Sequence, residues 1–312
     1  MIGRTWTRVA VLALLWGSAF LWIRIALDHG LSPAQVTVAR SAFGAAALLV
    51  LARLGGRGLP RDRATWGRLV VAAFFCNALP FLLFAVGVGS TSSGLAGVLN
   101  ATTPLWSLLI GIAVGTDRGL RPVRLAGLLL GFAGTLLIFA PWQEGGPPGW
   151  GALAMLGGAA SYAVAFAYMG RRLAGRGDPV ALSAAQLLAA TALSTPALAA
   201  GGAVPVQADL TALVAVVVLG VFSTGLTFYL NFRLIADEGA TSAAVVGYLL
   251  PVVSVTLGAL VLGEDLTLRV IAGMAVVLLG VGLSRRSPSH PAPPDTRARP
   301  RDHRGHTGSL TD

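Results

Sequence analysis

The sequence contains no lysine. All 23 basic residues are arginines, and charged residues make up only 12% of the chain. There is a single cysteine, Cys76, which lies within an apolar run, so no intramolecular disulfide and no cysteine metal site can form. The four histidines, His29, His290, His303 and His306, fall in a loop and in the C-terminal segment. From these shortages we expect neither a metal nor a cofactor.

Apolar residues, in contrast, make up 55% of the chain, and the mean hydropathy is +0.75. A soluble domain carries about 25% charged residues. A helix crosses about 30 Å of hydrocarbon with about 20 apolar residues, so the composition predicts an all-α integral membrane protein. We predict ten spanning helices: Val9–Ala26, Pro33–Leu51, Leu69–Val88, Ser93–Gly115, Val123–Phe139, Gly149–Met169, Pro179–Ala199, Leu210–Ile235, Thr241–Leu262 and Leu268–Leu283.

The chain also contains an internal repeat with an offset of 147 residues, which changes by one residue beyond the matched prolines. An offset shared over about fifty positions indicates a duplicated unit, and internal repeats in an apolar chain are typical of secondary transporters. Identical residues recur at this offset: Phe81 with Phe228, Ala96 with Ala243, Pro104 with Pro251, and Ser107 with Ser254.

A segment rich in proline and glycine separates the fifth predicted span from the sixth, and such residues do not continue a helix. We therefore predict a first repeat at residues 1–140, a loop at 141–148 and a second repeat at 149–284. The remaining residues, 285–312, are rich in Pro and Arg and nearly free of apolar side chains. Such a tail cannot bury enough surface to become ordered, and we expect it to be disordered.

The arginines predict the orientation, because cytoplasmic loops collect positive charge. With the N-terminus inside, all arginines except Arg24, Arg40 and Arg269 fall in inner segments. This predicts a plasma-membrane protein with both termini in the cytoplasm. Five spans per half is an odd number, so the second half enters the membrane in the opposite orientation, as in inverted repeats. Because the arginines lie in loops and not on one amphipathic face, we expect no binding of nucleic acid.

An ordered set of short motifs points to a known family. With the two five-helix halves, the set resembles the drug/metabolite transporter superfamily, in its ten-helix EamA branch, from Thr7 to about Leu283. The resemblance implies a basket of ten helices around a central cavity and, for most members, export of amino acids and other small metabolites. The motifs are Trp16-Gly17-Ser18-Ala19-Phe20, Pro33 with Arg40, Pro104, Pro251, and Gly263-Glu264. The first repeat departs from the pattern, because Asp117 stands at the position that corresponds to Glu264 in the second repeat.

Arg40 lies about seven residues inside the second predicted span. An arginine within the membrane costs about 2.5–3.5 kcal/mol on insertion scales and usually faces a polar cavity. Its planar fork suits a substrate carboxylate; a structural arginine bonded to backbone carbonyls is the alternative. Gln186 takes the same place in the second repeat, since Pro179 corresponds to Pro33. A neutral amide opposite a cation fits an amino-acid-like substrate, although a helix–helix polar bond would explain Gln186 equally well.

Other polar side chains within the spans form a second group of candidates. Trp and Tyr prefer the membrane interface, so those in mid-span are candidates for lining a substrate site, with packing as the alternative. Buried amides need hydrogen-bond partners in lipid. The group comprises Trp16, Tyr162, Tyr168, Tyr229, Tyr248, Asn77 and Asn100. Pro104 and Pro251 are predicted to kink spans four and nine at equivalent places, as hinges.

Acidic residues are missing from the middle of the predicted spans, so a carboxylate proton relay of the usual kind is absent. Glu264, at the end of span nine, is the best candidate for proton coupling, and facilitated transport is the alternative. No Walker A motif is found, which excludes ATP hydrolysis by that route.

Together these features predict a secondary transporter, not an enzyme, that exports small metabolites such as amino acids by alternating access. Its partners are a small-molecule substrate and the lipid bilayer. Three alternatives stay open: an uptake permease, a drug exporter of the same fold, and a membrane sensor or scaffold that transports nothing. The oligomeric state also stays open, and a monomer is compatible with all of these hypotheses.

Overall fold

The computed structural model describes residues 2–88, 98–115, 121–143, 149–200, 209–262 and 266–285, and these contain helices and no strand. The all-helical prediction is confirmed. In the first half the helices are α1 (Ile2–Gly17), α2 (Ala19–Asp28), α3 (Pro33–Leu54), α4 (Arg63–Ala73), a first π-helix (Phe74–Ala78), α5 (Leu79–Val88), α7 (Thr103–Ala113), α8 (Pro122–Phe139) and a 3-10 turn (Pro141–Gln143). In the second half they are α9 (Trp150–Arg172), α10 (Pro179–Ser194), α11 (Pro196–Ala200), α12 (Leu210–Gly220), a second π-helix (Val221–Leu226), α13 (Thr227–Glu238), α14 (Ala240–Ala244), a 3-10 helix (Val245–Tyr248), α15 (Leu249–Leu262) and α16 (Leu268–Arg285).

Eight helical stretches in the described part of the chain are long and apolar enough to cross a membrane. The protein is therefore a multi-span membrane protein, as predicted. The fourth and tenth predicted spans correspond to the shorter apolar helices Val98–Ala113 and Leu268–Ser284. Several crossings consist of two helical segments in series, because the chain turns or changes helical pitch within the span.

Side-chain caps fix where four of these helices begin. Ser32 accepts a hydrogen bond from the Gln35 amide before α3, and the aspartates Asp62, Asp178 and Asp209 cap α4, α10 and α12 in the same way. A cap satisfies amide groups that the first turn of a helix leaves without a partner. The backbone N–H of Thr65 lowers the pKa of Asp62, and that of Ala212, followed by His29, lowers the pKa of Asp209. Several acidic residues near the span ends therefore have a structural role.

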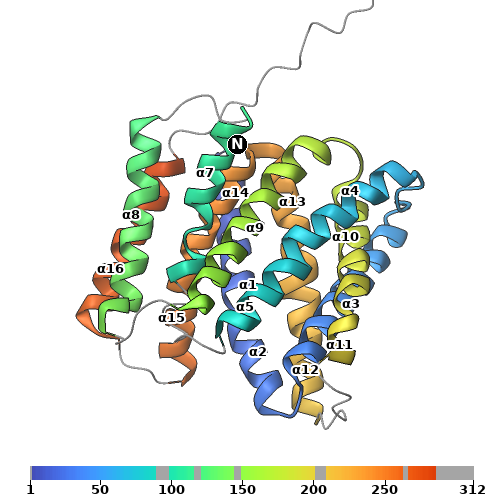
Figure 1. Ribbon diagram of the computed structural model, residues 1–312, viewed down its shortest axis with the longest axis horizontal. Coiled ribbons are helices and arrows are strands. Elements are labelled where there is room, and N and C mark those ends of the chain that lie inside the picture. Colours follow the sequence, from blue (N-terminus) through green and yellow to red (C-terminus); the bar gives the residue numbers. More distant parts are fainter. Residues whose placement is uncertain are drawn as a thin grey trace, which may run out of the picture.

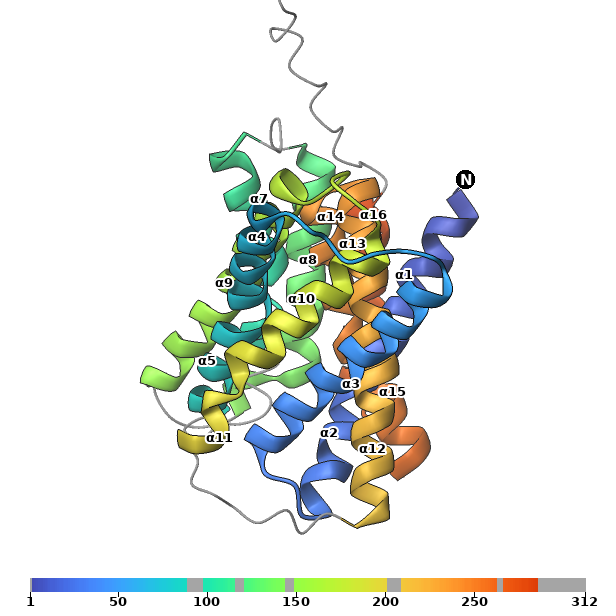
Figure 2. The ribbon, with the colours of Figure 1, turned by 90° about the vertical axis from the view of Figure 1, so that its right-hand side faces the viewer.

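The helices that pack most extensively against each other join the two halves of the chain. α8 pairs with α16, α3 with α10, α5 with α9, and α2 with α12. In Figure 1, α8 and α16 form the left edge of the bundle, and α3, α4 and α10 lie on the right. In Figure 2, α10 and α3 run diagonally side by side across the front of the bundle. The core thus lies largely between the halves.

Glycines allow the backbones of α8 and α16 to touch. A Cβ added to Gly134 would lie 2.6 Å from the amide nitrogen of Val277 and 2.8 Å from the carbonyl oxygen of Gly273. Small residues at such positions are typical of helix packing in membranes. This glycine seam is made by Gly127, Gly134, Gly273 and Gly280.

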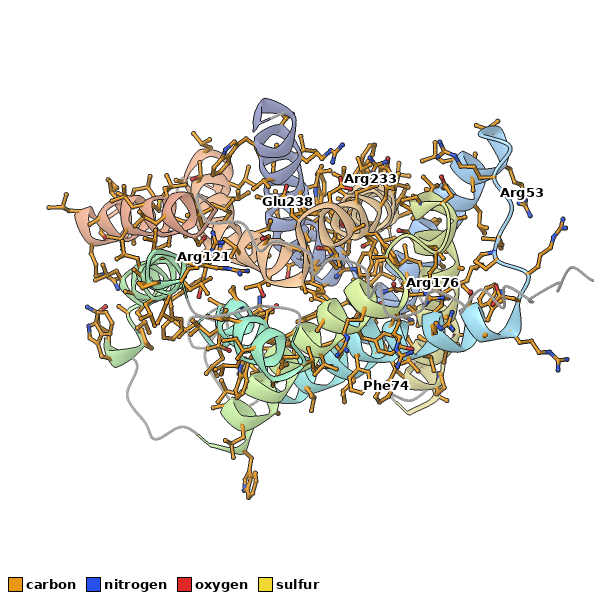
Figure 3. The ribbon with its side chains drawn as sticks, turned by 90° about the horizontal axis from the view of Figure 1, so that it is seen from above. Arg53, Phe74, Arg121, Arg176, Arg233 and Glu238 are labelled. Carbon is orange, nitrogen blue, oxygen red and sulfur yellow. The ribbon has the colours of Figure 1, made fainter. Side chains whose placement is uncertain are left out.

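One end of the bundle carries many of the arginines. The N-terminus, the C-terminal ends of α3, α9 and α13, and the start of α8 lie at this end (Figure 1). Figure 3 looks down on it and labels Arg53, Arg121, Arg176 and Arg233. Ion pairs of 2.6 Å between Arg8 and Asp237 and of 3.3 Å between Arg57 and Asp178 join the two halves here. At the opposite end, His29 Nδ1 lies 2.7 Å from Asp209 Oδ2.

Candidate functional site

Two π-helices interrupt the spans at equivalent places in the two halves. The first begins at Phe74 and the second at Val221, 147 residues later, which is the offset of the sequence repeat. A π-helix is an uncommon single-turn bulge that often occurs at functional sites. The two bulges separate α4 from α5 and α12 from α13, and buried polar side chains from other helices bond to both of them.

Arg40 projects from α3 toward the second π-helix and is only 8% exposed. Its Nε donates a hydrogen bond of 3.1 Å to Thr224 Oγ1, and its guanidinium carbon lies 5.3 Å from the centre of the Phe81 ring. Among the described residues, no carboxylate forms an ion pair with Arg40, and its two terminal nitrogens make no hydrogen bond. Its fork is therefore available to an anionic group.

Thr224 holds Arg40 in place because of the local bulge. Its hydroxyl donates to the carbonyl of Leu219, five residues earlier, at 2.9 Å, which leaves the oxygen lone pairs to accept from Arg40. Close backbone contact brings the two elements together. A Cβ added to Gly44 on α3 would lie 2.8 Å from the carbonyl oxygen of Gly220.

Gln186 makes the equivalent contact with the two halves of the chain exchanged. It lies on α10, equivalent to α3, and donates from Nε2 to Asn77 Oδ1 in the first π-helix at 3.4 Å. Asn77 corresponds to Thr224 at the offset of 147 residues. Both Asn77 and Gln186 are 0% exposed, and the side chain of Gln186 lies near the thiol of Cys76. In each half, the second spanning helix, which is α3 or α10, therefore contacts the π-helix of the other half.

Tyr162 lies in the neighbourhood of both groups. It lies on α9 close enough to both Arg40 and Cys76 to interact electrostatically. Its ring stacks on Phe84 with 6.1 Å between centroids and contacts Phe166. The structure thus brings together five polar side chains predicted or noted from the sequence: Arg40, Cys76, Asn77, Tyr162 and Gln186.

Two serines, Ser161 and Ser18, also contact the π-helix of the opposite half. Ser161 on α9 donates to the carbonyl of Phe75 in the first π-helix at 2.7 Å. Its counterpart Ser18, between α1 and α2, lies 3.4 Å from Ser223 in the second π-helix. The two bulges are therefore contacted by equivalent residues.

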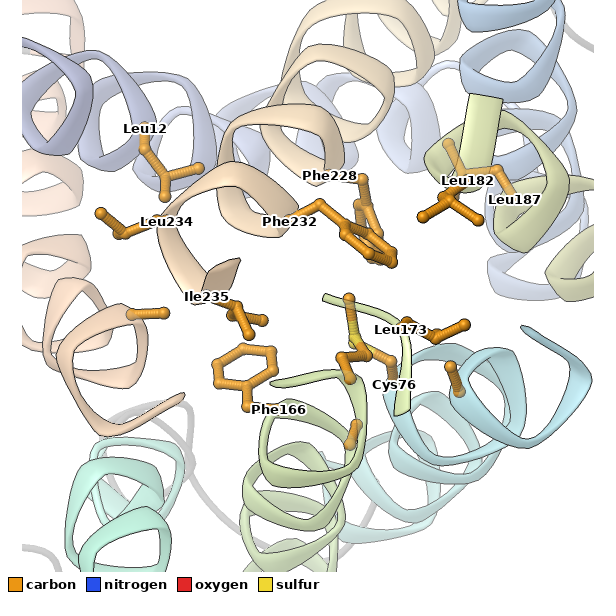
Figure 4. Packing of buried hydrophobic residues seen from close by; sticks show 14 of the residues in the cluster. Leu12, Cys76, Phe166, Leu173, Leu182, Leu187, Phe228, Phe232, Leu234 and Ile235 are labelled. Atoms are coloured by element: carbon orange, nitrogen blue, oxygen red, sulfur yellow. The ribbon is translucent and has the colours of Figure 1, made fainter. Parts of the chain in front are cut away.

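The other predicted aromatic residues do not form one group. Trp16, Tyr168 and Tyr229 are partly buried and pack against the larger apolar cluster, part of which Figure 4 shows. In Figure 4, Leu12 of α1 points toward Leu234 of α13, and Phe166 of α9 lies next to Ile235 of α13. Tyr248 belongs to a separate cluster.

Tyr248 is 0% exposed and packs against Gly131 of α8, away from the first cluster, and its hydroxyl has no hydrogen-bond partner among the described residues. The structure therefore does not place Tyr248 with Arg40.

The predicted hinges lie at breaks in the spans. Pro104 is in the first turn of α7, which follows a turn at Ala101–Thr102, and Pro251 is in the first turn of α15, which follows a 3-10 helix. Asn100 is partly buried and its carbonyl accepts from Thr103 Oγ1 at 2.7 Å. The residues just before each proline thus leave the α-helical path.

Two sets of predictions fall outside what is described. Glu264 lies outside the described residues, as does the tail from residue 286. Within the described residues, no group of three His, Cys, Asp or Glu side chains could hold a metal ion.

Sequence reasoning missed Thr224, Phe81 and the glycines that bring α3 against α12. Thr224 could have been found, because it occupies the place of Asn77 in the second repeat. Phe81 was noted only as part of the repeat. The contacts of Gly44, Gly220 and Gly225 depend on the crossing of two helices from different halves, which sequence spacing does not encode.

Comparison with known proteins gives a consistent result. Residues 6–140 and 149–286 each match the model of the EamA-like transporter family. The chain is 26% identical over 284 residues to an "Uncharacterized transporter" of Archaeoglobus fulgidus, covering 89% of this chain and 97% of the relative. It is 29% identical over 282 residues to the "Uncharacterized inner membrane transporter YedA" of Escherichia coli K12, covering 87% of each. A solved structure, titled "Crystal structure of protein", matches with a TM-score of 0.75 at 22% identity, over 89% of this chain and 98% of that chain.

Proposed function

The chain belongs to the EamA-like transporter family, and on that premise we propose that it is a secondary transporter that exports small metabolites such as amino acids. The family resemblance drawn from the sequence is confirmed. A transporter role in a multi-span membrane protein follows from the family and from relatives named as transporters. The substrate, the direction and the mechanism are the proposal.

The mechanism is alternating access between two inverted five-helix repeats. Three kinds of contact support it, because each occurs twice with the halves exchanged. α3 packs on α12 as α10 packs on α4, Arg40 bonds Thr224 as Gln186 bonds Asn77, and Ser161 contacts the first π-helix as Ser18 contacts the second. Two halves related by an axis in the membrane plane can exchange conformations and open the site to either side.

The membrane is the plasma membrane, with both termini in the cytoplasm. The gathering of arginine at the end of the bundle that holds the N-terminus supports this orientation, because cytoplasmic segments collect Arg. One relative is named as an inner membrane transporter, which supports the location.

The observation that carries the substrate class is the buried guanidinium of Arg40. A buried cation without a counter-charge costs several kcal/mol, and no described carboxylate offsets that cost for Arg40. A substrate carboxylate can do so by a bidentate pair, which is short and strong. The face of Phe81 and the nearby Tyr162 then contact the apolar part of the substrate.

Efflux from loaded proteoliposomes tests the proposal. Wild type, Arg40→Ala and Arg40→Lys are compared over a panel of amino acids and organic cations, with and without a pH gradient. Arg269→Ala is the matched control, since Arg269 donates to the carbonyl of Leu137 and belongs to the α8–α16 pair. We expect carboxylate-bearing substrates to move in wild type and in Arg269→Ala, to slow in Arg40→Lys and to stop in Arg40→Ala.

Three results would contradict parts of the proposal. Movement of cations alone would make the protein a drug exporter and leave Arg40 structural. Transport only toward the side that holds the arginine-rich end would indicate uptake. No transport of any compound by folded protein would favour a sensor or scaffold.

A further inference from the structure

Asn77 and Gln186 carry polar atoms that have no partner. The two side chains share one hydrogen bond, from Gln186 Nε2 to Asn77 Oδ1, and at 3.4 Å it is long. Asn77 Nδ2 and Gln186 Oε1 are sealed from solvent and have no hydrogen-bond partner among the described residues. Two amides that paired with each other completely would use all four groups, whereas here one donor and one acceptor are left.

This result does not depend on which amide atom is nitrogen and which is oxygen. Exchanging the two atoms in both side chains gives the same single bond and again leaves one donor and one acceptor. Exchanging them in one side chain only would place two donors or two acceptors against each other. The described pair therefore offers one N–H and one C=O group in either assignment.

These atoms belong to the same cluster as Arg40. Arg40 lies over the ring of Phe81, which follows Asn77 by four residues in the same span, and Tyr162 stacks on Phe84 one turn further along. The cluster thus presents a cationic fork and a neutral donor–acceptor pair. Buried polar groups are rarely left without partners, so a ligand that reaches both ends would satisfy them together.

We propose that the substrate carries a carboxylate at one end and an uncharged amide at the other, with the carboxylate bound by Arg40 and the amide bound by Asn77 and Gln186. This inference rests on the proposed transport function. An amide supplies both an N–H for Gln186 Oε1 and a C=O for Asn77 Nδ2. An ester supplies only the acceptor. An ammonium supplies three donors and a charge to a place where the described cluster offers one acceptor and no acid.

Three probes with the same carbon skeleton separate these cases. Succinamate, monomethyl succinate and 4-aminobutanoate all carry a carboxylate, and they end in an amide, an ester and an ammonium group. Malonamate and glutaramate vary the length of the amide probe. Binding to purified full-length protein is followed by tryptophan fluorescence, and exchange of the labelled probes is followed in proteoliposomes.

We expect at least one amide probe to bind about tenfold or more tightly than monomethyl succinate and 4-aminobutanoate, because each lost hydrogen bond in a buried site weakens binding by about that factor. In Gln186→Met the preference for amide over ester should fall to about one, because this variant loses the acceptor for the amide N–H. Asn77→Leu loses the donor to the carbonyl group, which both probes carry, so it should weaken binding of both probes and keep the preference. Binding of both probes should still depend on Arg40 in each variant. Thr191→Val is the control on α10, since its hydroxyl donates to the helix carbonyl of Leu187. It should keep the preference.

Equal binding of amide and ester probes by wild type overturns the inference, as does a preference that persists in Gln186→Met. In either case the two amides serve only helix packing. Tight binding of 4-aminobutanoate alone, with transport of amino acids that depends on Arg40, overturns the inference and leaves the proposed function standing. Absence of both binding and transport overturns the two together.

Discussion

The closest contact between α3 and α12 predicts that Gly220→Ala destabilises the protein. A Cβ added to Gly220 would lie 2.5 Å from Cβ of Phe43 and 3.0 Å from the carbonyl oxygen of Arg40. Neither atom can rotate away, because one is a Cβ and the other belongs to the backbone. Carbon atoms in contact lie about 3.5–4.0 Å apart, so α3 would have to move away by about 1 Å.

Overpacking of this kind costs about 1–3 kcal/mol, and the higher helix propensity of alanine returns about 0.5–1 kcal/mol. We therefore expect a net loss of about 1–2 kcal/mol in the free energy of unfolding. The shift would also lengthen the 3.1 Å bond between Arg40 and Thr224, which should raise the KM for a carboxylate substrate.

Thermal unfolding in lipid nanodiscs measures the first effect, and efflux kinetics measure the second. Gly67→Ala is the control, because Gly67 lies within α4 and a Cβ there would meet nothing within 4 Å. Gly67→Ala should unfold at the wild-type temperature or above, and Gly220→Ala below both. If Gly220→Ala matches Gly67→Ala in stability and in KM, the close packing that positions Arg40 is refuted.

Two further predictions concern single side chains. Thr224→Val should raise the KM for a carboxylate substrate by about tenfold or more, because a hydrogen bond to a charged group contributes about 1.5–3 kcal/mol. Thr224→Ser keeps the hydroxyl group, so its KM should stay near that of wild type. Equal kinetics of the two variants would contradict the role of Thr224 in positioning Arg40. For Asp209, the backbone N–H of Ala212 and then His29 lower the pKa below its ordinary value of 3.8. Its contribution to stability is therefore present above pH 3.8 and is lost as the pH falls through the lower folded-state pKa. The unfolding temperatures of wild type and Asp209→Asn should thus differ at pH 6 and converge in strong acid, and a constant difference would contradict this cause.

Much of the fold could be predicted from the sequence, because hydropathy and spacing depend on local composition. Long apolar segments predict helices in a membrane whatever their neighbours are. The repeats could be identified by identical residues 147 positions apart, and the two π-helices begin at the same separation. Their existence could not be predicted, since a π-helix inserts one residue into a turn without any composition of its own.

The candidate site was predictable only in part. Arg40, Gln186 and Asn77 stood out because charged and amide side chains are rare within spans. Their partners depend on how helices from different halves cross, so Thr224 and Phe81 were missed. Tyr248 had the same sequence signature as Tyr162, but burial against Gly131 places it in another cluster.

The pairing of helices across the two halves has a consequence for how the protein assembles. α8 packs on α16, α3 on α10, α5 on α9 and α2 on α12, so each half lacks a complete core of its own. The peptide segment that joins residues 140 and 149 takes part in none of these helix pairs. Two separate polypeptides, cut between the repeats, would still contain every surface needed to find each other in the bilayer, whereas either one alone would present its glycine seam and its polar bulge to lipid.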